Sequence, residues 1–230
     1  VGGFIGYIRN NNNMVMTIFN CTNDGTITGN TWIGGVVGYL YGNTKMKMTI
    51  SNCVNNGLIT GDQTIGGFIG KFFNNTDTEV DISNCNNNGP ISGRRSLGGF
   101  TGEIEMKTNM NMSLSNFTNT GKISGSIFVG GFVANIVSDA NSKSLSFNIV
   151  NSANKGNVSA ENGMACGMFC VSQDSGQDLN TTVLNSINKG SVNATTNAYG
   201  IANIITKARN VVSMGEVNAS SDSFTFWNAS

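Results

Sequence analysis

The sequence has no histidine and only one proline, and only 11% of its residues are charged. Histidine is a common ligand in zinc sites, so its absence argues against a metal centre of that kind. The 13 basic residues balance the 13 acidic ones. Such a chain offers no electrostatic footprint for nucleic acid and no basic patch for a membrane surface. We therefore expect no nucleic-acid partner and no cofactor.

Long apolar runs are also missing. No segment approaches the ~20 apolar residues of a membrane-spanning helix, so we expect no membrane insertion in this segment. The five cysteines cannot all pair with one another, which excludes the complete disulfide framework of small secreted domains. The sequence starts at Val1 inside a repeated motif, and we expect it to be cut from a longer chain.

A motif with two adjacent glycines recurs every 32 residues in the first five copies, as in IGGVVG from Ile33 and IGGFIG from Ile65. Two degenerate copies follow, MACGMF and NAYGIA. The tail, residues 223–230, resembles the opening strand of an eighth copy. We interpret residues 1–230 as one repeat domain whose copies start near residues 1, 33, 65, 97, 129, 164 and 197.

A glycine in a predicted turn is the most constant position of the repeat. It occurs at Gly25, Gly57, Gly89, Gly121, Gly156, Gly190 and Gly215. Five residues before it an asparagine recurs, at Asn20, Asn52, Asn84, Asn116, Asn151, Asn185 and Asn210. A second asparagine lies two residues before the glycine in six copies and is replaced by Ser213 in the seventh.

Within each copy the apolar residues alternate with polar ones, which predicts strands rather than helices. In KMKMTIS, for example, Met46, Met48 and Ile50 share one face. Three short strands per copy, stacked copy on copy, would bury a continuous core. We predict an all-β fold, a right-handed parallel β-solenoid of about seven rungs of ~32 residues. A seven-bladed propeller is the competing architecture, but 32 residues are few for a four-stranded blade.

Charges placed 32 residues apart support this stacking, because opposite charges on adjacent strands stabilise each other. Three acidic residues fall above three lysines. The predicted pairs are Lys45 with Asp77, Lys47 with Glu79, and Lys71 with Glu103. By contrast, Arg94 and Arg95 look like an isolated basic pair in a turn. Because the carboxylates are scattered or paired with lysine, we expect no enzymatic activity.

Cys21, Cys53 and Cys85 occupy one column of the stack. Phe117 takes the same place in the next copy, so we predict buried structural thiols rather than a metal or redox site. Cys166 and Cys170 would lie about 13 Å apart on one extended strand, too far for a disulfide. A second column contains Phe4, Phe68, Phe100 and Phe132. Core packing is favoured there over an exposed aromatic ladder that stacks sugars or bases.

The asparagines are expected to shape turns, because Asn tolerates unusual backbone angles and Gly supplies positive φ. We predict that the column beginning at Asn20 also forms a ladder of hydrogen-bonded amides. Several N-x-[ST] sequons occur by virtue of composition. Asn20 and Asn116 should be poor glycan acceptors because they lie in the ladder. The possible N-glycosylation sites are Asn74, Asn111, Asn157, Asn180 and Asn193.

The pair of signals GGFIG and, about twenty residues on, CVNNGLITG resembles the GLUG-type repeats of adhesin-like and other surface or secreted proteins. The likeness is good from Val1 to about Ser126 and looser beyond. It departs from the family name, since Gly-Phe or Gly-Val replaces Gly-Leu in most copies. The resemblance implies an extracellular or cell-surface location and an adhesive or structural use, and it carries no catalytic residues.

Three functions are therefore open. The first is a structural stalk or self-assembling filament segment, whose partners are further repeats of the parent chain or second copies stacked end to end. The second is an adhesin that binds a glycan or a host surface through an exposed sheet. The third is an accessory domain of a polysaccharide-active enzyme.

Overall fold

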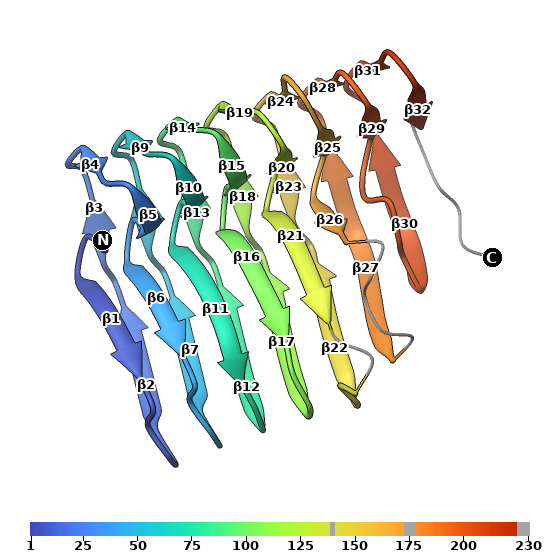
Figure 1. Cartoon of the computed structure of the whole chain (residues 1–230). Helices are drawn as coiled ribbons and strands as arrows, with labels where there is room; N and C mark the ends of the chain where they lie inside the picture. The colour runs from blue at the N-terminus through green and yellow to red at the C-terminus, as the bar shows by residue number, and fades with distance from the viewer. Residues whose placement is uncertain (139–140, 173–177, 225–230) are drawn as a thin grey trace.

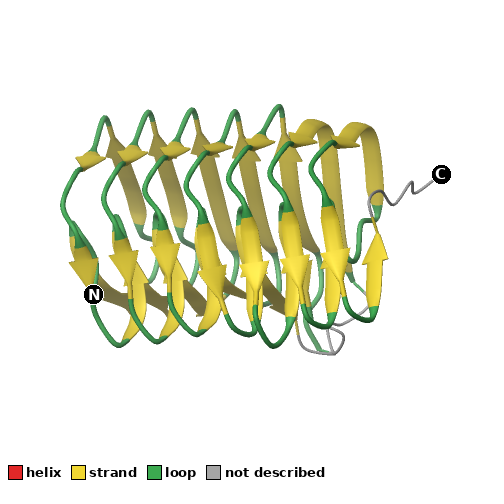
Figure 2. Ribbon diagram, turned by 90° about the horizontal axis from the view of Figure 1, so that it is seen from above, coloured by secondary structure: helices red, strands yellow, loops and turns green. Residues whose placement is uncertain are grey.

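The computed structural model describes residues 1–138, 141–172 and 178–224, and those residues form strands and turns without any helix. Consequently no described segment is a helix that could span a membrane. The chain winds through four parallel sheets, and each rung contributes to all of them except near the end (Figure 1). This arrangement is the predicted parallel β-solenoid, with about six turns spaced about 32 residues apart. Figure 2 shows the rungs stacked side by side along one axis.

The four sheets form the sides of the solenoid. The six-stranded sheet contains β1 (Ile5–Arg9), β6 (Val37–Tyr41), β11 (Ile69–Asn75), β16 (Thr101–Met106), β21 (Val133–Ser138) and β26 (Phe169–Val171). The sheet that precedes it in each rung contains β5 (Thr31–Gly34), β10 (Gln63–Gly66), β15 (Arg95–Gly98), β20 (Phe128–Gly130), β25 (Met164–Cys166), β29 (Asn197–Tyr199) and β32 (Asp222–Phe224).

The other two sheets close each rung. The largest contains β2 (Val15–Phe19), β7 (Lys47–Ser51), β12 (Thr78–Ser83), β17 (Met110–Ser115), β22 (Leu145–Val150), β27 (Leu179–Asn188) and β30 (Lys207–Ser213), with β3 (Thr22–Asn23), β8 (Val54–Asn55), β13 (Asn86–Asn87), β18 (Thr118–Asn119) and β23 (Ala153–Asn154). The last contains β4 (Ile27–Thr28), β9 (Ile59–Thr60), β14 (Ile91–Ser92), β19 (Ile123–Gly125), β24 (Val158–Ala160), β28 (Val192–Ala194) and β31 (Val217–Ala219).

A complete rung is therefore more finely divided than the three expected strands. The Gly-Gly segment bends after Gly34, which separates β5 from β6, and Asn52 separates β7 from β8. Asn52 has a φ of 53°, in the left-handed region that interrupts an extended strand. Every member of this asparagine column has a φ between 49° and 54°. Asparagine fits there because its short polar side chain tolerates this conformation better than most side chains do.

The register follows the sequence repeat at first and then drifts. Ile65 pairs with Ile33 on one side and Leu97 on the other, as the 32-residue period predicts. Val129 then pairs with Ala165, so the sixth copy aligns one residue later than the start expected at Met164. Near the C-terminus, β32, at the start of the predicted eighth copy, pairs with β29 as the seventh strand of its sheet. The remainder of the predicted eighth strand, residues 225–230, lies outside the described residues.

Two apolar clusters run along the solenoid. The larger lies between the six-stranded and the largest sheets and includes Met48, Ile50 and Phe100. The smaller lies between the other two sheets and includes Ile33, Ile59 and Ile91. The predicted aromatic column is part of the larger cluster, since Phe68, Phe100 and Phe132 are fully buried, whereas Phe4 in the first rung is exposed.

The turn glycines serve a different purpose from the one expected. Their φ angles lie outside the left-handed region, and Gly42 is the only described glycine with positive φ. A Cβ on Gly89 would instead collide with the carbonyl oxygen of Gly57 in the preceding rung. The same collision recurs at Gly57, Gly121, Gly156, Gly190 and Gly215. Close stacking of backbone on backbone therefore requires glycine here.

This steric account predicts that Gly89→Ala lowers the free energy of unfolding by about 3 kcal/mol, because the added methyl group forces two rungs apart. Gly25→Ala is the matched control, since a Cβ there would meet only the Asn23 side chain, at 3.7 Å. We expect that variant to stay within about 0.5 kcal/mol of the parent. Urea unfolding measures both, and equal losses in the two variants would refute the steric explanation.

Candidate functional site

A buried column of asparagine amides runs along the solenoid, and it is not the column predicted to form the main ladder. It contains the asparagines two residues before each turn glycine. Nδ2 of Asn23 donates to Oδ1 of Asn55, Asn55 donates to Asn87, and Asn87 donates to Asn119, each at 2.7 Å. The column continues from Asn119 through Asn154 and Asn188 to Ser213, at 2.8, 2.7 and 3.3 Å.

Each inner amide also bonds within its own rung. Asn87 donates its second Nδ2 hydrogen to the carbonyl oxygen of Gly89 at 3.1 Å. Both amide hydrogens are therefore used, and Oδ1 accepts from the preceding rung. Asn55, Asn87, Asn119, Asn154 and Asn188 are fully buried. A buried primary amide is costly unless its donors and acceptor are paired, so the column stabilises only the register that stacks amide on amide.

The second glycine of each Gly-Gly pair packs against both the next rung and this column, since a Cβ on Gly67 would collide first with the carbonyl oxygen of Gly99. A Cβ on Gly67 would lie 2.6 Å from Oδ1 of Asn87, and Gly35, Gly99, Gly131 and Gly167 meet the inner asparagine of their own rung in the same way. In sequence, each of these glycines and each inner asparagine lies between a residue of the larger apolar cluster and a residue of the smaller one. The asparagine column thus lies between the two cores, and glycine leaves room for it.

The outer column, predicted as the ladder, bonds less completely. Rung-to-rung bonds join Asn116 to Asn84 (3.0 Å), Asn185 to Asn151 (3.2 Å) and Asn210 to Asn185 (2.9 Å), all between exposed side chains. All asparagines of this outer column share a left-handed backbone conformation. A further short ladder, from Asn11 to Asn43 and Asn75, stacks at another corner.

The cysteine column behaves as a set of hydrogen-bonding core residues. The backbone N–H of Cys21 donates to Sγ of Cys53, and that of Cys53 donates to Sγ of Cys85, both at 3.4 Å. Ser152 and Ser186 take the same place in later rungs, where the N–H of Ser152 donates to Oγ of Ser186 at 3.1 Å. Small groups that both donate and accept thus occupy five of the seven positions, and Phe117 and Val211 fill the other two with apolar side chains.

Burial also keeps these thiols protonated. Cys53 and Cys85 are fully buried, whereas Cys21 in the first rung is only half-buried, against the expectation that all three are buried. Desolvation raises the pKa of the Cys53 thiol and raises the pKa of Cys85 to about 12. Because the thiolate is the reactive form, both cysteines are poor nucleophiles and poor metal ligands. Among the described residues, no cluster of three His, Cys, Asp or Glu side chains could hold a metal ion.

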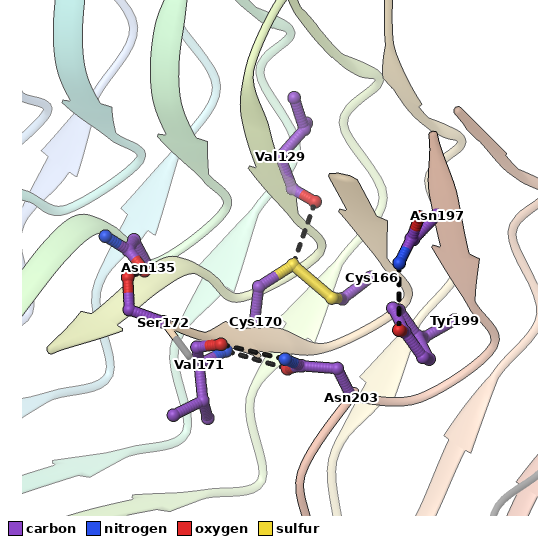
Figure 3. The surroundings of a disulfide bond; sticks show 9 residues. All are labelled: Val129, Asn135, Cys166, Cys170, Val171, Ser172, Asn197, Tyr199 and Asn203. Carbon is purple, nitrogen blue, oxygen red and sulfur yellow. Dashed lines mark hydrogen bonds between the residues drawn. A yellow bond between two sulfur atoms is a disulfide. The ribbon is translucent and has the colours of Figure 1, made fainter. Parts of the chain in front are cut away.

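A disulfide between Cys166 and Cys170 overturns the sequence prediction (Figure 3). The prediction assumed one extended strand, but β25 ends at Cys166 and β26 begins at Phe169, and the bend brings the two Cα atoms to 5.6 Å. Earlier rungs place Gly66 and Gly70, or Gly98 and Gly102, at these two positions. The i, i+4 glycine pattern is therefore the signal that could have indicated the close approach.

Two of the three ion pairs predicted between rungs form in the structure. Lys47 and Glu79 pair at 3.0 Å, and Lys71 and Glu103 pair at 2.7 Å, as predicted. Lys45 and Asp77 do not pair. Both have positive φ at a corner of the rung, and the Asp77 carboxylate accepts a bond from Nδ2 of Asn109 at 2.7 Å instead.

The interpretation of Arg94 as an unpaired turn residue is wrong. Its guanidinium contacts Asp62, with Nε 2.6 Å from Oδ1 and a second bond of 3.0 Å. This bidentate contact lowers the pKa of Asp62 to about 2. The two residues are 32 positions apart, so the same subtraction that located the lysine pairs would have found this one.

The candidate glycosylation sites differ in accessibility. Asn74, Asn111, Asn157 and Asn180 are exposed, whereas Asn193 is half-buried and accepts a bond from Asn218. Asn20 and Asn116, expected to be poor acceptors, are also exposed. Glycosylation at any of them stays a prediction.

Comparison with known proteins gives no relative: no family model, curated protein or solved structure matches the chain.

Asn87→Ala should lower the free energy of unfolding by about 3 kcal/mol, because it leaves Nδ2 of Asn55, Oδ1 of Asn119 and the carbonyl of Gly89 short of a partner. Asn88→Ala is the matched control. Asn88 also bonds across rungs, to Asn56 at 2.9 Å, but it is exposed. Its loss should be about 0.5 kcal/mol or less. Chemical denaturation compares the two variants, and a control loss as large as that of Asn87→Ala would contradict the ladder's role.

We expect the Cys166–Cys170 disulfide in protein made in an oxidising compartment, with Cys21, Cys53 and Cys85 remaining as thiols. Replacing both bonded cysteines by alanine should cost about 2 kcal/mol. Cys53→Ser, which places in that column the residue type found at Ser152, should cost about 1 kcal/mol or less. Peptide mapping after alkylation of unfolded, unreduced protein locates the bond. Alkylation of both Cys166 and Cys170 would disprove it.

Proposed function

We propose that the chain is a non-catalytic structural segment of an extracellular or cell-surface protein, a stiff stalk whose length is set by its number of rungs. The observation that carries this proposal is the buried amide column, bonded from Asn23 to Ser213 without a gap. In a solenoid each rung contacts its neighbours, so added rungs extend the rod at constant cross-section. A bonded column inside such a rod resists bending and slippage between rungs.

Two features favour an extracellular location. The Cys166–Cys170 disulfide is typical of oxidising compartments. Polar side chains also supply the solubility that a low charge content does not, and several sequon asparagines are exposed on that surface. The pairing of the charged side chains also supports a scaffold without catalytic activity. Asp62, Glu79, Glu103 and Glu105 are each paired with a basic side chain.

A variant in which residues 33–96 are duplicated in tandem tests the stalk proposal. Two extra rungs should lengthen the particle by about 10 Å while the radius of gyration of its cross-section stays constant. Small-angle X-ray scattering measures both quantities. The control carries Asn55→Ala and Asn87→Ala in the inserted copy only. Its particle should not show the same increase in length at constant cross-section. Isotropic growth of the duplicated variant would contradict the proposal.

A further inference from the structure

Aromatic side chains gather on one part of the solenoid surface. The chain has four tyrosines and two tryptophans. Three of those tyrosines and one tryptophan lie together with Phe73 on the outside of the six-stranded sheet and the neighbouring strand β5. We call Tyr7, Trp32, Tyr39, Tyr41 and Phe73 the aromatic patch. An aromatic cluster on a surface otherwise rich in Asn, Ser and Thr indicates a contact site.

The rings of the patch are fixed by stacking on one another. Tyr39 is the central ring and is buried. Trp32 stacks on it with ring centroids 4.2 Å apart and planes 20° apart, and Tyr7 stacks on it at 5.2 Å and 3°. Tyr41 stacks on Phe73 at 5.7 Å and 14°. Tyr7 and Trp32 nevertheless remain 47% and 42% exposed. The free faces are thus held in fixed orientations, which lowers the entropic cost of binding a ligand.

The patch borders a shallow cleft of about 350 Å³, lined by Val1, Gly6, Tyr7, Trp32, Tyr39 and Tyr41. A cleft with aromatic walls and few polar groups is the usual form of a small-ligand site.

Trp32 has an unfavourable backbone for its size. Its φ is 51°, and the equivalent positions in the next two rungs are Thr64 and Ser96, also with positive φ. Glycine, asparagine and small polar residues adopt this conformation at less cost than a bulky aromatic residue. The stack on Tyr39 offsets part of this backbone cost, but the ring stays 42% exposed, so we explain the tryptophan by ligand contact in addition to packing.

Hydrogen-bonding groups adjoin the rings and carry both signs of charge. Lys71 pairs in register with Tyr39, and Glu103 lies beyond it. Lys71 and Glu103 form the 2.7 Å ion pair, and Nζ of Lys71 lies 4.5 Å from the centre of the Phe73 ring. Burial, reinforced by Tyr7, Tyr41 and the two nearby glutamates, raises the pKa of Tyr39 to about 12, so its hydroxyl is a hydrogen-bond donor at neutral pH.

The charges around the patch indicate which class of ligand it could bind. Glu103 and Glu105 are each paired with a lysine, and Arg9 lies over the Tyr7 ring at 5.6 Å. The charges around the patch are thus nearly balanced and form no cluster of basic side chains of the kind that binds a nucleic acid or another polyanion. A sugar ring presents an apolar C–H face that can lie on an aromatic plane, and its hydroxyl groups both donate and accept. Exposed, oriented rings beside a balanced polar rim suit that chemistry.

We propose that the aromatic patch is a binding site for neutral saccharides, in which a sugar ring stacks on Trp32 and Tyr7 and its hydroxyl groups bond to Tyr41 and the Lys71–Glu103 pair. The site goes beyond the stalk proposal, because a stalk requires no ligand. A saccharide site on its side would let the stalk hold a glycan-coated surface.

The test uses a glycan array of neutral oligosaccharides, followed by titration calorimetry with cellohexaose, maltohexaose and any array hit. A sulfated oligosaccharide and a single-stranded oligonucleotide are the anionic comparators. We expect at least one neutral glycan to bind, and Trp32→Ala and Tyr41→Ala each to weaken that binding at least about tenfold. Melting temperatures must show that both variants remain folded.

Tyr199→Ala is the matched control, since Tyr199 stacks on Phe224 at 5.4 Å and 8° but lies outside the patch. It should leave binding unchanged. Absence of any neutral ligand for the folded parent, binding that survives both patch substitutions, or binding of the anionic comparators alone would overturn the proposal. The scattering test of the stalk is unaffected by these outcomes, so the two proposals fail separately.

Discussion

The fold depends on satisfying a row of buried primary amides. An inner asparagine such as Asn87 has two donors and an acceptor inside the protein, and it finds partners for all of them when it lies over Asn55 and under Asn119. A slip of one residue would leave these groups unpaired in a dry interior, at a cost of kilocalories per rung. The hydrophobic columns favour stacking in general, whereas the amides select one register. Because all the bonds point the same way along the axis, each polarises the next.

The glycines follow from the same constraint. The turn glycines let the backbone of one rung lie directly on that of the next, as Gly89 lies on Gly57. The second glycine of each Gly-Gly pair leaves space for the backbone of the next rung and for the asparagine of its own rung. Both sets of glycines therefore serve close approach rather than backbone flexibility. The outer asparagines, such as Asn52, supply the left-handed angle that turns the chain at the corner. The repeat is thus a set of mutually dependent contacts around one amide column.

The sequence predicted the architecture and most of the register, because a 32-residue period places Lys47 under Glu79 and Ile33 under Ile65 wherever the repeat is exact. It failed where the rung bends. The disulfide was missed because Cys166 and Cys170 were placed on one straight strand, and the Lys45–Asp77 pair was expected without regard to the corner on which both residues lie. The choice between the two asparagine columns also needed the structure, because the outer column recurs in all seven copies and the inner one in only six, whereas burial favours the inner one. The aromatic patch is not periodic, so the repeat pattern did not single out Trp32 or Tyr41.

Exchange of the asparagine side-chain amide hydrogens, followed by NMR in D₂O, tests the central role of the inner column most directly. The account predicts that the Nδ2 hydrogens of Asn55, Asn87 and Asn119 are strongly protected, whereas those of Asn56 and Asn88, whose hydrogen bonds are exposed to water, exchange much faster. Equal, rapid exchange of both sets in the folded protein would contradict a buried, rung-to-rung amide column.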